Sequence, residues 1–195
     1  MKKSIVESLF RDNHGVMTSK ELLENGVTYY TIRSLLSSGY IEKVKRGIYT
    51  LAHESEDELE LVNKIVPNGI LCMQSAAIVY DYTNKVPLRY HLSIDNKSRV
   101  NLPDYPKIKL YYWSKSQREL GIEDKNHNGV NIKIYNKEKT ICDYIRFRNK
   151  LDYSEVKEVL KSYMRDSNRD IVRLKTYSKE LRIRTVLDHY LESMI

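Results

Sequence analysis

Hydroxyl-bearing and basic side chains gather between residues 28 and 46, where their types and spacing suit contact with nucleic acid. Tyrosine, serine and threonine hydroxyls and the arginine guanidinium can hydrogen-bond base edges or phosphates, and lysine and arginine neutralise the phosphate backbone. The residues that we expect to contact DNA are Thr28, Tyr30, Thr31, Arg33, Ser34, Ser37, Lys43, Lys45 and Arg46.

A helix that begins after Thr28 would hold most of these side chains. Ile32, Leu35 and Leu36 recur at helical spacing and predict one apolar face, and Ser38-Gly39 predicts the end of the helix. At about 100° per residue, the opposite face carries Tyr30, Ser34 and Ser37, with Thr31 and Arg33 on its shoulders and Tyr29 nearer the core.

Two further helices are expected before it. Apolar residues at helical spacing over residues 3–13 predict the first, which ends near Gly15. Thr18 and Glu21 have the spacing of a capping box, and Met17 and Leu22 that of a hydrophobic staple, which together predict a short helix ending near Asn25-Gly26. The tight connection at residues 26–28 then predicts a helix-turn-helix.

The pattern changes from helix to strand after Gly39. Residues 40–44 and 48–51 flank Lys45-Arg46-Gly47, which predicts a β-hairpin with a basic turn. Three helices followed by such a hairpin are typical of a winged helix-turn-helix, whose wing would place Lys43, Lys45 and Arg46 beside the DNA backbone or in the minor groove. The alternative is a small helical unit that contacts another protein.

Composition favours a globular protein with a polyanionic partner. The 195 residues are 41% hydrophobic and 30% charged, and 33 basic against 26 acidic residues give a net charge of +7.

No apolar run approaches the roughly 20 residues that a bilayer span needs, and Lys2-Lys3 and Glu7 predict no export signal. Two distant cysteines, Cys72 and Cys142, predict a reducing, cytoplasmic location.

The rest of the chain predicts a second domain, so we expect an α+β protein with an N-terminal winged helix-turn-helix over residues 1–53 and a C-terminal domain over residues 54–195. A helix is expected from the acidic junction at 53–58 to Val66, a short strand at 69–73 and a helix at 74–80 capped near Ser75. Further strands are expected at 90–94, 108–113 and 130–135, with four helices after Lys137. The C-terminal domain is therefore expected to hold a mixed sheet with flanking helices.

Catalytic patterns are almost absent, so we expect no enzyme activity, no catalytic residue, no metal ligand and no cofactor. The five histidines lack metal-binding spacing, and no phosphate-binding glycine loop is present. The alternative is a metal-dependent nuclease or another nucleic-acid-acting enzyme guided by the winged helix, since Pro103-Asp104 and Glu123-Asp124-Lys125 follow the PD…(D/E)xK pattern. Residues 121–129 are so polar that we predict a solvated loop there instead of a catalytic strand.

Several segments together resemble the AbiEi-type antitoxins of type IV, or abortive-infection, toxin–antitoxin systems. The N-terminal part of the resemblance comprises Met17–Leu22, Ser34–Leu36 and Gly39–Tyr49. The remaining part comprises Gln74–Ala77, Tyr90–Ile94, Lys139–Tyr144, Tyr177–Leu181 and Tyr190-Leu191, so that the resemblance extends over essentially the whole chain.

This resemblance implies a repressor of its own toxin–antitoxin operon that binds inverted repeats in double-stranded promoter DNA. It also implies a C-terminal domain that counteracts a nucleotidyltransferase-like toxin without forming a stable complex with it, in a system that defends bacteria against phage. We expect no membrane partner, and a monomer in solution that pairs on DNA.

Overall fold

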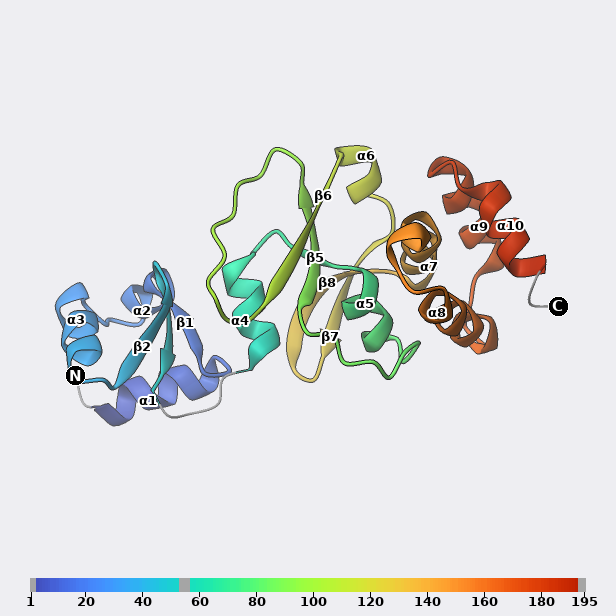
Figure 1. Ribbon diagram of the computed structural model, residues 1–195. Helices are drawn as coiled ribbons and strands as arrows, with labels where there is room; N and C mark the ends of the chain where they lie inside the picture. The colour runs from blue at the N-terminus through green and yellow to red at the C-terminus, as the bar shows by residue number, and fades with distance from the viewer. Residues whose placement is uncertain (1–2, 53–56, 193–195) are drawn as a thin grey trace. The chain divides into compact units, whose positions relative to one another are not determined.

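The computed structural model describes residues 3–52 and 57–192 and divides into two compact units. The first comprises Met1–Asn68 and Val100–Ile108, and the second comprises Gly69–Arg99 and Lys109–Ile195. The predicted fold class is confirmed: a helix-turn-helix-like region with strands comes first, and a mixed sheet with flanking helices follows it (Figure 1).

The first unit combines helices with short strands. Its elements are α1 (Lys3–Asp12), β1 (Val16–Thr18), α2 (Ser19–Glu24), α3 (Tyr29–Ser37), β2 (Ile41–Lys45), β3 (Ile48–Leu51) and α4 (Glu58–Ile65). The three strands form an antiparallel sheet in the order β1-β3-β2. Sequence patterns predicted the hairpin and missed β1, because three residues are too few to show a period of two.

One apolar cluster holds this unit together. Val6 and Phe10 from α1, Leu22 from α2, and Ile32 and Leu35 from α3 are at most 6% exposed and pack with residues of the sheet. Helices α1 and α3 each contribute residues three or four positions apart, so the spacing that forms their apolar faces also determines which face packs against the core. The polar faces of the helices therefore point outward.

The first unit continues beyond residue 53, where a boundary was expected. The backbone N–H of Asp57 donates to the carbonyl of His14 at 3.0 Å, and Lys64 on α4 pairs with Glu21 on α2 at 2.6 Å. These contacts place α4 in the first unit, and residues 100–108 return to the same unit. Residues 53–56 of the acidic junction expected at 53–58 lie outside the described residues.

A five-stranded mixed sheet forms the centre of the second unit. Its strands are β4 (Ile70–Leu71), β5 (Tyr90–Asp95), β6 (Ile108–Trp113), β7 (Ile122–His127) and β8 (Val130–Tyr135), in the order β6-β5-β4-β8-β7. Strand β4 runs parallel to β8 and antiparallel to β5, and β7 runs antiparallel to β8.

The prediction of a polar loop at residues 121–129 is wrong. Six residues of this segment form β7, which pairs with β8 from Ile122 opposite Tyr135 to His127 opposite Val130. Strand β7 lies at the edge of the sheet, and none of its six residues is buried. Its side chains therefore show no alternation of apolar and polar residues. Backbone pairing with β8 therefore defines the strand, and composition does not.

Helices complete the second unit. They are α5 (Met73–Val79), α6 (Lys115–Arg118), α7 (Lys137–Phe147), the 3₁₀ turn η1 (Arg148–Lys150), α8 (Tyr153–Arg165), α9 (Ile171–Glu180) and α10 (Arg184–Glu192). Helix α7 contacts α5, α8, α9 and α10 (Figure 1). Its buried apolar residues belong to one apolar cluster with residues of these helices. The four helices predicted after Lys137 are confirmed.

The start of α5 differs from its prediction. Cys72 occupies the N-cap position and makes no side-chain capping bond. The Ser75 hydroxyl, which we expected near the cap, instead accepts a hydrogen bond from the backbone N–H of His91 on β5 at 2.8 Å. Ser75 therefore joins the helix to the sheet. No helix in the described part of the chain is long and apolar enough to cross a membrane.

Candidate nucleic-acid interface

Side-chain caps set the geometry of the helix-turn-helix. The backbone N–H of Glu21 donates to the Thr18 hydroxyl at 3.2 Å, and the Glu21 carboxylate accepts from the Thr18 N–H at 2.6 Å. At the start of α3, the Thr28 hydroxyl accepts from the Thr31 N–H at 3.2 Å. Gly26 has φ +79°, a conformation that side-chain-bearing residues rarely adopt. Both predicted caps are confirmed, and they fix where α2 and α3 begin.

Helix α3 presents one face to the core and one to solvent. Ile32 and Leu35 are buried, whereas Tyr30 is 84% exposed and Arg33, Ser34 and Ser37 are also exposed. The first turn of the helix carries no acidic residue. This exposed face combines hydroxyl groups, an aromatic ring and a guanidinium, which are groups that can reach base edges and phosphates.

Tyr29 lies differently from its prediction. We expected it near the core, but it is 62% exposed. Its position at the first residue of α3 explains the difference, because only the following turns of the helix lie against the apolar cluster. Two adjacent tyrosine rings are therefore exposed at the N-terminal end of α3, and the helical-wheel pattern identified only one of them.

Thr28 and Thr31 act together at the cap. Their hydroxyl oxygens lie 3.0 Å apart, in addition to the bond between the Thr28 hydroxyl and the Thr31 backbone. Each hydroxyl retains further hydrogen-bonding capacity. The structure thus brings both residues to the start of α3, beside Tyr30, where they stabilise the helix and remain accessible or partly accessible.

The tip of the hairpin is attached to the helix-turn-helix. The backbone N–H of Ser19, the first residue of α2, donates to the carbonyl of Gly47 at 2.9 Å. Gly47 has φ +81°, and a Cβ there would lie 3.5 Å from the Ser19 hydroxyl oxygen. The glycine is needed for its backbone conformation, and the attachment fixes the turn of the hairpin to the start of α2.

The three basic residues of the hairpin have different surroundings. Lys43 and Arg46 are exposed, but the Lys45 ammonium donates to the carbonyl of Ile65 at the end of α4, at 3.2 Å. A cation is favourable there because the last carbonyls of a helix carry partial negative charge. Lys43 and Arg46 are therefore available to a partner, whereas Lys45 has an internal contact that sequence patterns could not reveal.

A partly buried acidic group on α2, Glu21, is neutralised. Partial burial of Glu21 disfavours its ionised form, but the hydrogen bond and charge of Lys64 and the N–H of Thr18 outweigh that effect and lower its pKa. The negative charge is thus balanced within the unit. Residues 29–51 contain four basic residues, Arg33, Lys43, Lys45 and Arg46, and one acidic residue, Glu42. This segment therefore carries a net charge of +3.

Three residues of the nuclease alternative, Glu123, Asp124 and Lys125, are engaged in other contacts. The Tyr80 hydroxyl donates to Glu123 at 3.3 Å, Asp124 pairs with Lys133 at 3.1 Å, and the Lys125 ammonium lies 4.5 Å from the centre of the Tyr80 ring. Within residues 3–52 and 57–192, no group of three or more His, Cys, Asp and Glu side chains is placed to hold a metal ion. The geometry gives this alternative no support.

The two cysteines lie in apolar surroundings. Cys72 and Cys142 are both buried, and burial raises the pKa of each thiol above its ordinary value. The thiolate is the reactive form of cysteine, so a raised pKa disfavours nucleophilic chemistry. Cys142 packs inside the helical cluster, as predicted.

Comparisons with known proteins agree with this geometry. Residues 4–52, which contain α1 to β3, match the family described as transcriptional regulator, AbiEi antitoxin. The predicted resemblance is thereby confirmed over this quarter of the chain. No curated protein matches the chain.

A solved structure extends the likeness beyond the N-terminal region. The chain is similar to the RV2827C protein from Mycobacterium tuberculosis over 96% of its own length and 79% of that protein, with 14% sequence identity and a TM-score of 0.51. At this identity the likeness concerns the fold alone.

Proposed function

We propose that this protein is a DNA-binding antitoxin that represses its own toxin–antitoxin operon. The observation that carries the proposal is the exposed face of Tyr30, Arg33 and Ser34 on α3, together with the exposed cations Lys43 and Arg46 of the hairpin in the same unit. The match of residues 4–52 to antitoxin regulators supports the same assignment. In this proposal α3 enters the major groove and the hairpin acts as the wing of a winged helix-turn-helix.

The further parts of the proposal rest on the resemblance to AbiEi-type antitoxins. The operator is double-stranded DNA with inverted repeats, and the protein is a monomer that pairs on it. The second unit counteracts a nucleotidyltransferase-like toxin without a stable complex, and the system is of type IV and protects against phage. The chain itself carries out no catalysis.

A gel-shift titration with promoter DNA from the protein's own operon tests DNA binding. We expect the Arg33→Ala, Lys43→Ala and Arg46→Ala triple variant to lose specific binding. A matched triple variant of exposed cations in the second unit, Lys161→Ala, Arg165→Ala and Lys175→Ala, removes the same charge and should retain it. Equal losses in both would show that binding depends on net charge alone and would contradict the proposed interface.

Antitoxin activity has a separate test. Co-expression of the toxin with the DNA-binding triple variant should still allow growth if the second unit counteracts the toxin. Growth arrest with this variant, although it is folded and present in normal amounts, would show that neutralisation requires DNA binding.

A further inference from the structure

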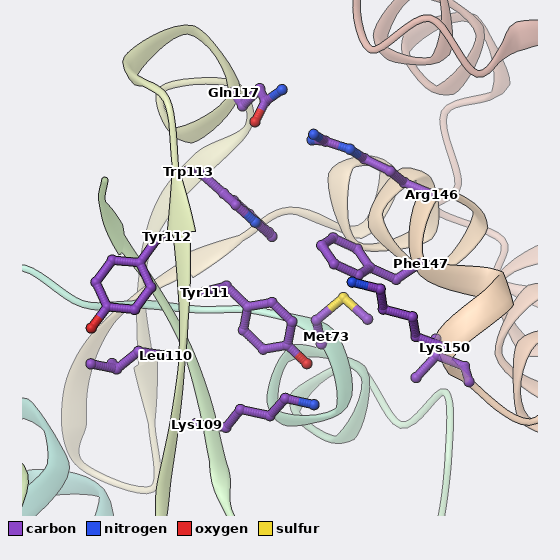
Figure 2. Close-up of a pocket in the computed structure, with 11 residues that line it drawn as sticks. Met73, Lys109, Leu110, Tyr111, Tyr112, Trp113, Gln117, Arg146, Phe147 and Lys150 are labelled. Atoms are coloured by element: carbon purple, nitrogen blue, oxygen red, sulfur yellow. The ribbon is translucent and has the colours of Figure 1, made fainter. Parts of the chain in front are cut away.

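A cavity of about 350 Å³ lies within the second unit, beside the edge strand β6. Side chains from β6, α6, α7 and the start of α5 converge on it (Figure 2). Its lining residues are Met73, Lys109, Leu110, Tyr111, Tyr112, Trp113, Gln117, Arg146, Phe147, Lys150 and Leu151. This volume is at the lower end of the range for small-molecule sites, roughly 300–1,000 Å³.

Aromatic rings form the wall of the cavity. The centres of the Trp113 and Phe147 rings lie 6.3 Å apart with their planes inclined by 27°, and the Tyr111 ring meets Phe147 edge to face at 5.5 Å. Figure 2 shows Tyr111 and Trp113 projecting from β6 toward Phe147 on α7. Tyr111 and Trp113 are at most 8% exposed, so a heteroaromatic base would stack only on the ring surface that borders the cavity.

Positive charge surrounds this wall. Lys109, Arg146 and Lys150 line the cavity, and its eleven lining residues include no carboxylate. None of the three cations makes an ion pair with a residue in the described part of the chain. The site therefore combines aromatic surface with three cations that form no ion pair within the described part of the chain.

One of these cations has an unsatisfied hydrogen-bond donor. The NH1 nitrogen of Arg146 is buried and has no hydrogen-bond partner within the described structure. A buried donor without a partner is unfavourable, and a guanidinium pairs well with phosphate oxygens. In Figure 2 the Arg146 side chain extends toward Gln117, whose amide can both donate and accept hydrogen bonds.

The backbone at the cavity floor is also unusual. Met73 is fully buried and has φ +50°, a conformation rarely adopted by a residue with a side chain. Residues held in such conformations cluster at ligand sites. This observation supports the assignment of a binding site, which rests on the aromatic wall and the cations.

We propose that this cavity binds a free nucleoside 5′-phosphate, with its base on the aromatic wall and its phosphates near Arg146 and Lys150. The three cations lie over the rings of this wall: Lys109 is 5.2 Å from the centre of the Tyr111 ring, and Lys150 and Arg146 are 5.9 and 6.0 Å from the centre of the Phe147 ring. A simple anion would use only the cations as contacts, and an uncharged ring only the aromatic surface. A single nucleotide satisfies both features within the volume available. The proposal is independent of the proposed operator binding, because every lining residue belongs to the second unit.

The chain provides its own spectroscopic reporter, since Trp113 is its only tryptophan. Full-length protein is titrated separately with adenosine, guanosine, cytidine and uridine 5′-triphosphates while tryptophan fluorescence is recorded. We expect saturable quenching by at least one nucleotide. The matching nucleoside and inorganic triphosphate should each bind at least about tenfold more weakly, because each lacks one half of the recognised chemistry.

Variants then locate the site by isothermal titration calorimetry. Lys150→Gln changes an exposed side chain, and Arg146→Gln removes the unsatisfied guanidinium; each should raise the Kd about tenfold through loss of a charge-assisted contact. Lys161→Gln, an exposed lysine on α8 outside the cavity, is the matched control and should leave the Kd unchanged. Lys150→Gln keeps the test decisive if Arg146→Gln does not fold.

Four outcomes would overturn the proposal. They are the absence of saturable quenching, equal binding of inorganic triphosphate, equal effects of Lys150→Gln and Lys161→Gln, and at least tenfold tighter binding of a single-stranded oligonucleotide than of the mononucleotide. The last result would identify a binding groove for a nucleic-acid strand. None of these outcomes bears on promoter binding by the first unit.

Discussion

Two groups of charged side chains, one in each unit, differ in their exposure. In the first unit, Arg33, Lys43 and Arg46 are exposed. In the second, Lys139 and Asp143 on α7 are completely buried, and the Lys139 ammonium lies 2.6 and 2.7 Å from the two carboxylate oxygens of Asp143. The first set is available to a partner, and the second is enclosed by the fold.

The buried pair belongs to a polar network inside an otherwise apolar region. The Lys139 ammonium lies 4.2 Å from the ring centres of both Trp113 and Tyr135, and the Tyr135 hydroxyl lies 2.7 Å from that of Ser93. Burial raises the pKa of Asp143, although Lys139 opposes that effect. In the function that we propose, the exposed charges of the first unit contribute to binding, whereas the buried pair on α7 belongs to the core.

The largest expected effect is that of breaking the buried pair. Lys139→Met leaves the Asp143 carboxylate buried without its partner, which should lower the free energy of unfolding by roughly 3–5 kcal/mol. Urea denaturation followed by circular dichroism measures this. The matched control is Lys115→Met, since Lys115 is 81% exposed and lies 3.8 Å from Glu119, and it should change little.

A double variant sharpens the same comparison. Lys139→Met with Asp143→Leu removes both charges, so the protein should be more stable than with Lys139→Met alone. If the double variant is as unstable as the single variant, packing around α7 and not the unpaired charge explains the loss.

A buried histidine predicts a pH dependence in the second unit. Burial, together with the positive charges of Lys109 and Arg89, lowers the pKa of His91 to about 4. The folded pKa is below the unfolded value, so the unfolded state takes up the proton first. Stability should therefore fall, by roughly 1–3 kcal/mol, as pH drops from about 6.5 to about 4.

Denaturation across this pH range tests the role of His91. His91→Gln should flatten the decline, whereas His189→Gln, which changes an exposed histidine on α10, should leave it intact. An unchanged decline in the His91 variant would assign the pH dependence to carboxylates.

Two substitutions in the first unit should affect DNA binding in different ways. Arg33→Ala should weaken binding to the operator by roughly 1–3 kcal/mol if the guanidinium contacts a base, with little change on unrelated DNA. Arg46→Ala should weaken binding to both DNAs alike and reduce the salt dependence. Fluorescence anisotropy at several salt concentrations distinguishes them, and identical profiles would contradict separate base and phosphate roles.

The smallest expected effect concerns a cap. Thr18→Ala removes the hydroxyl that accepts from the Glu21 N–H and should lower stability by about 1 kcal/mol. Thr185→Ala, an exposed position on α10, serves as the control in the same thermal-unfolding measurement. A loss no larger than that of the control would show that Glu21 and Lys64 hold the start of α2 without the Thr18 side chain.

The sequence by itself determined the local structure of this protein. The Thr18–Glu21 capping box, the Thr28 cap and the apolar spacing in α3 depend on residues three or four positions apart, so they could be predicted without knowledge of the fold. The exposed positions of Tyr30, Arg33 and Ser34 follow from the same spacing.

Only the tertiary structure decided the features that depend on distant residues. Strand β7 exists because β8 pairs with it, Lys45 contacts the end of α4, and residues 100–108 return to the first unit. The cavity likewise joins residues from Met73 to Leu151. These contacts depend on how separate elements pack and pair, and no local pattern of residues encodes that arrangement.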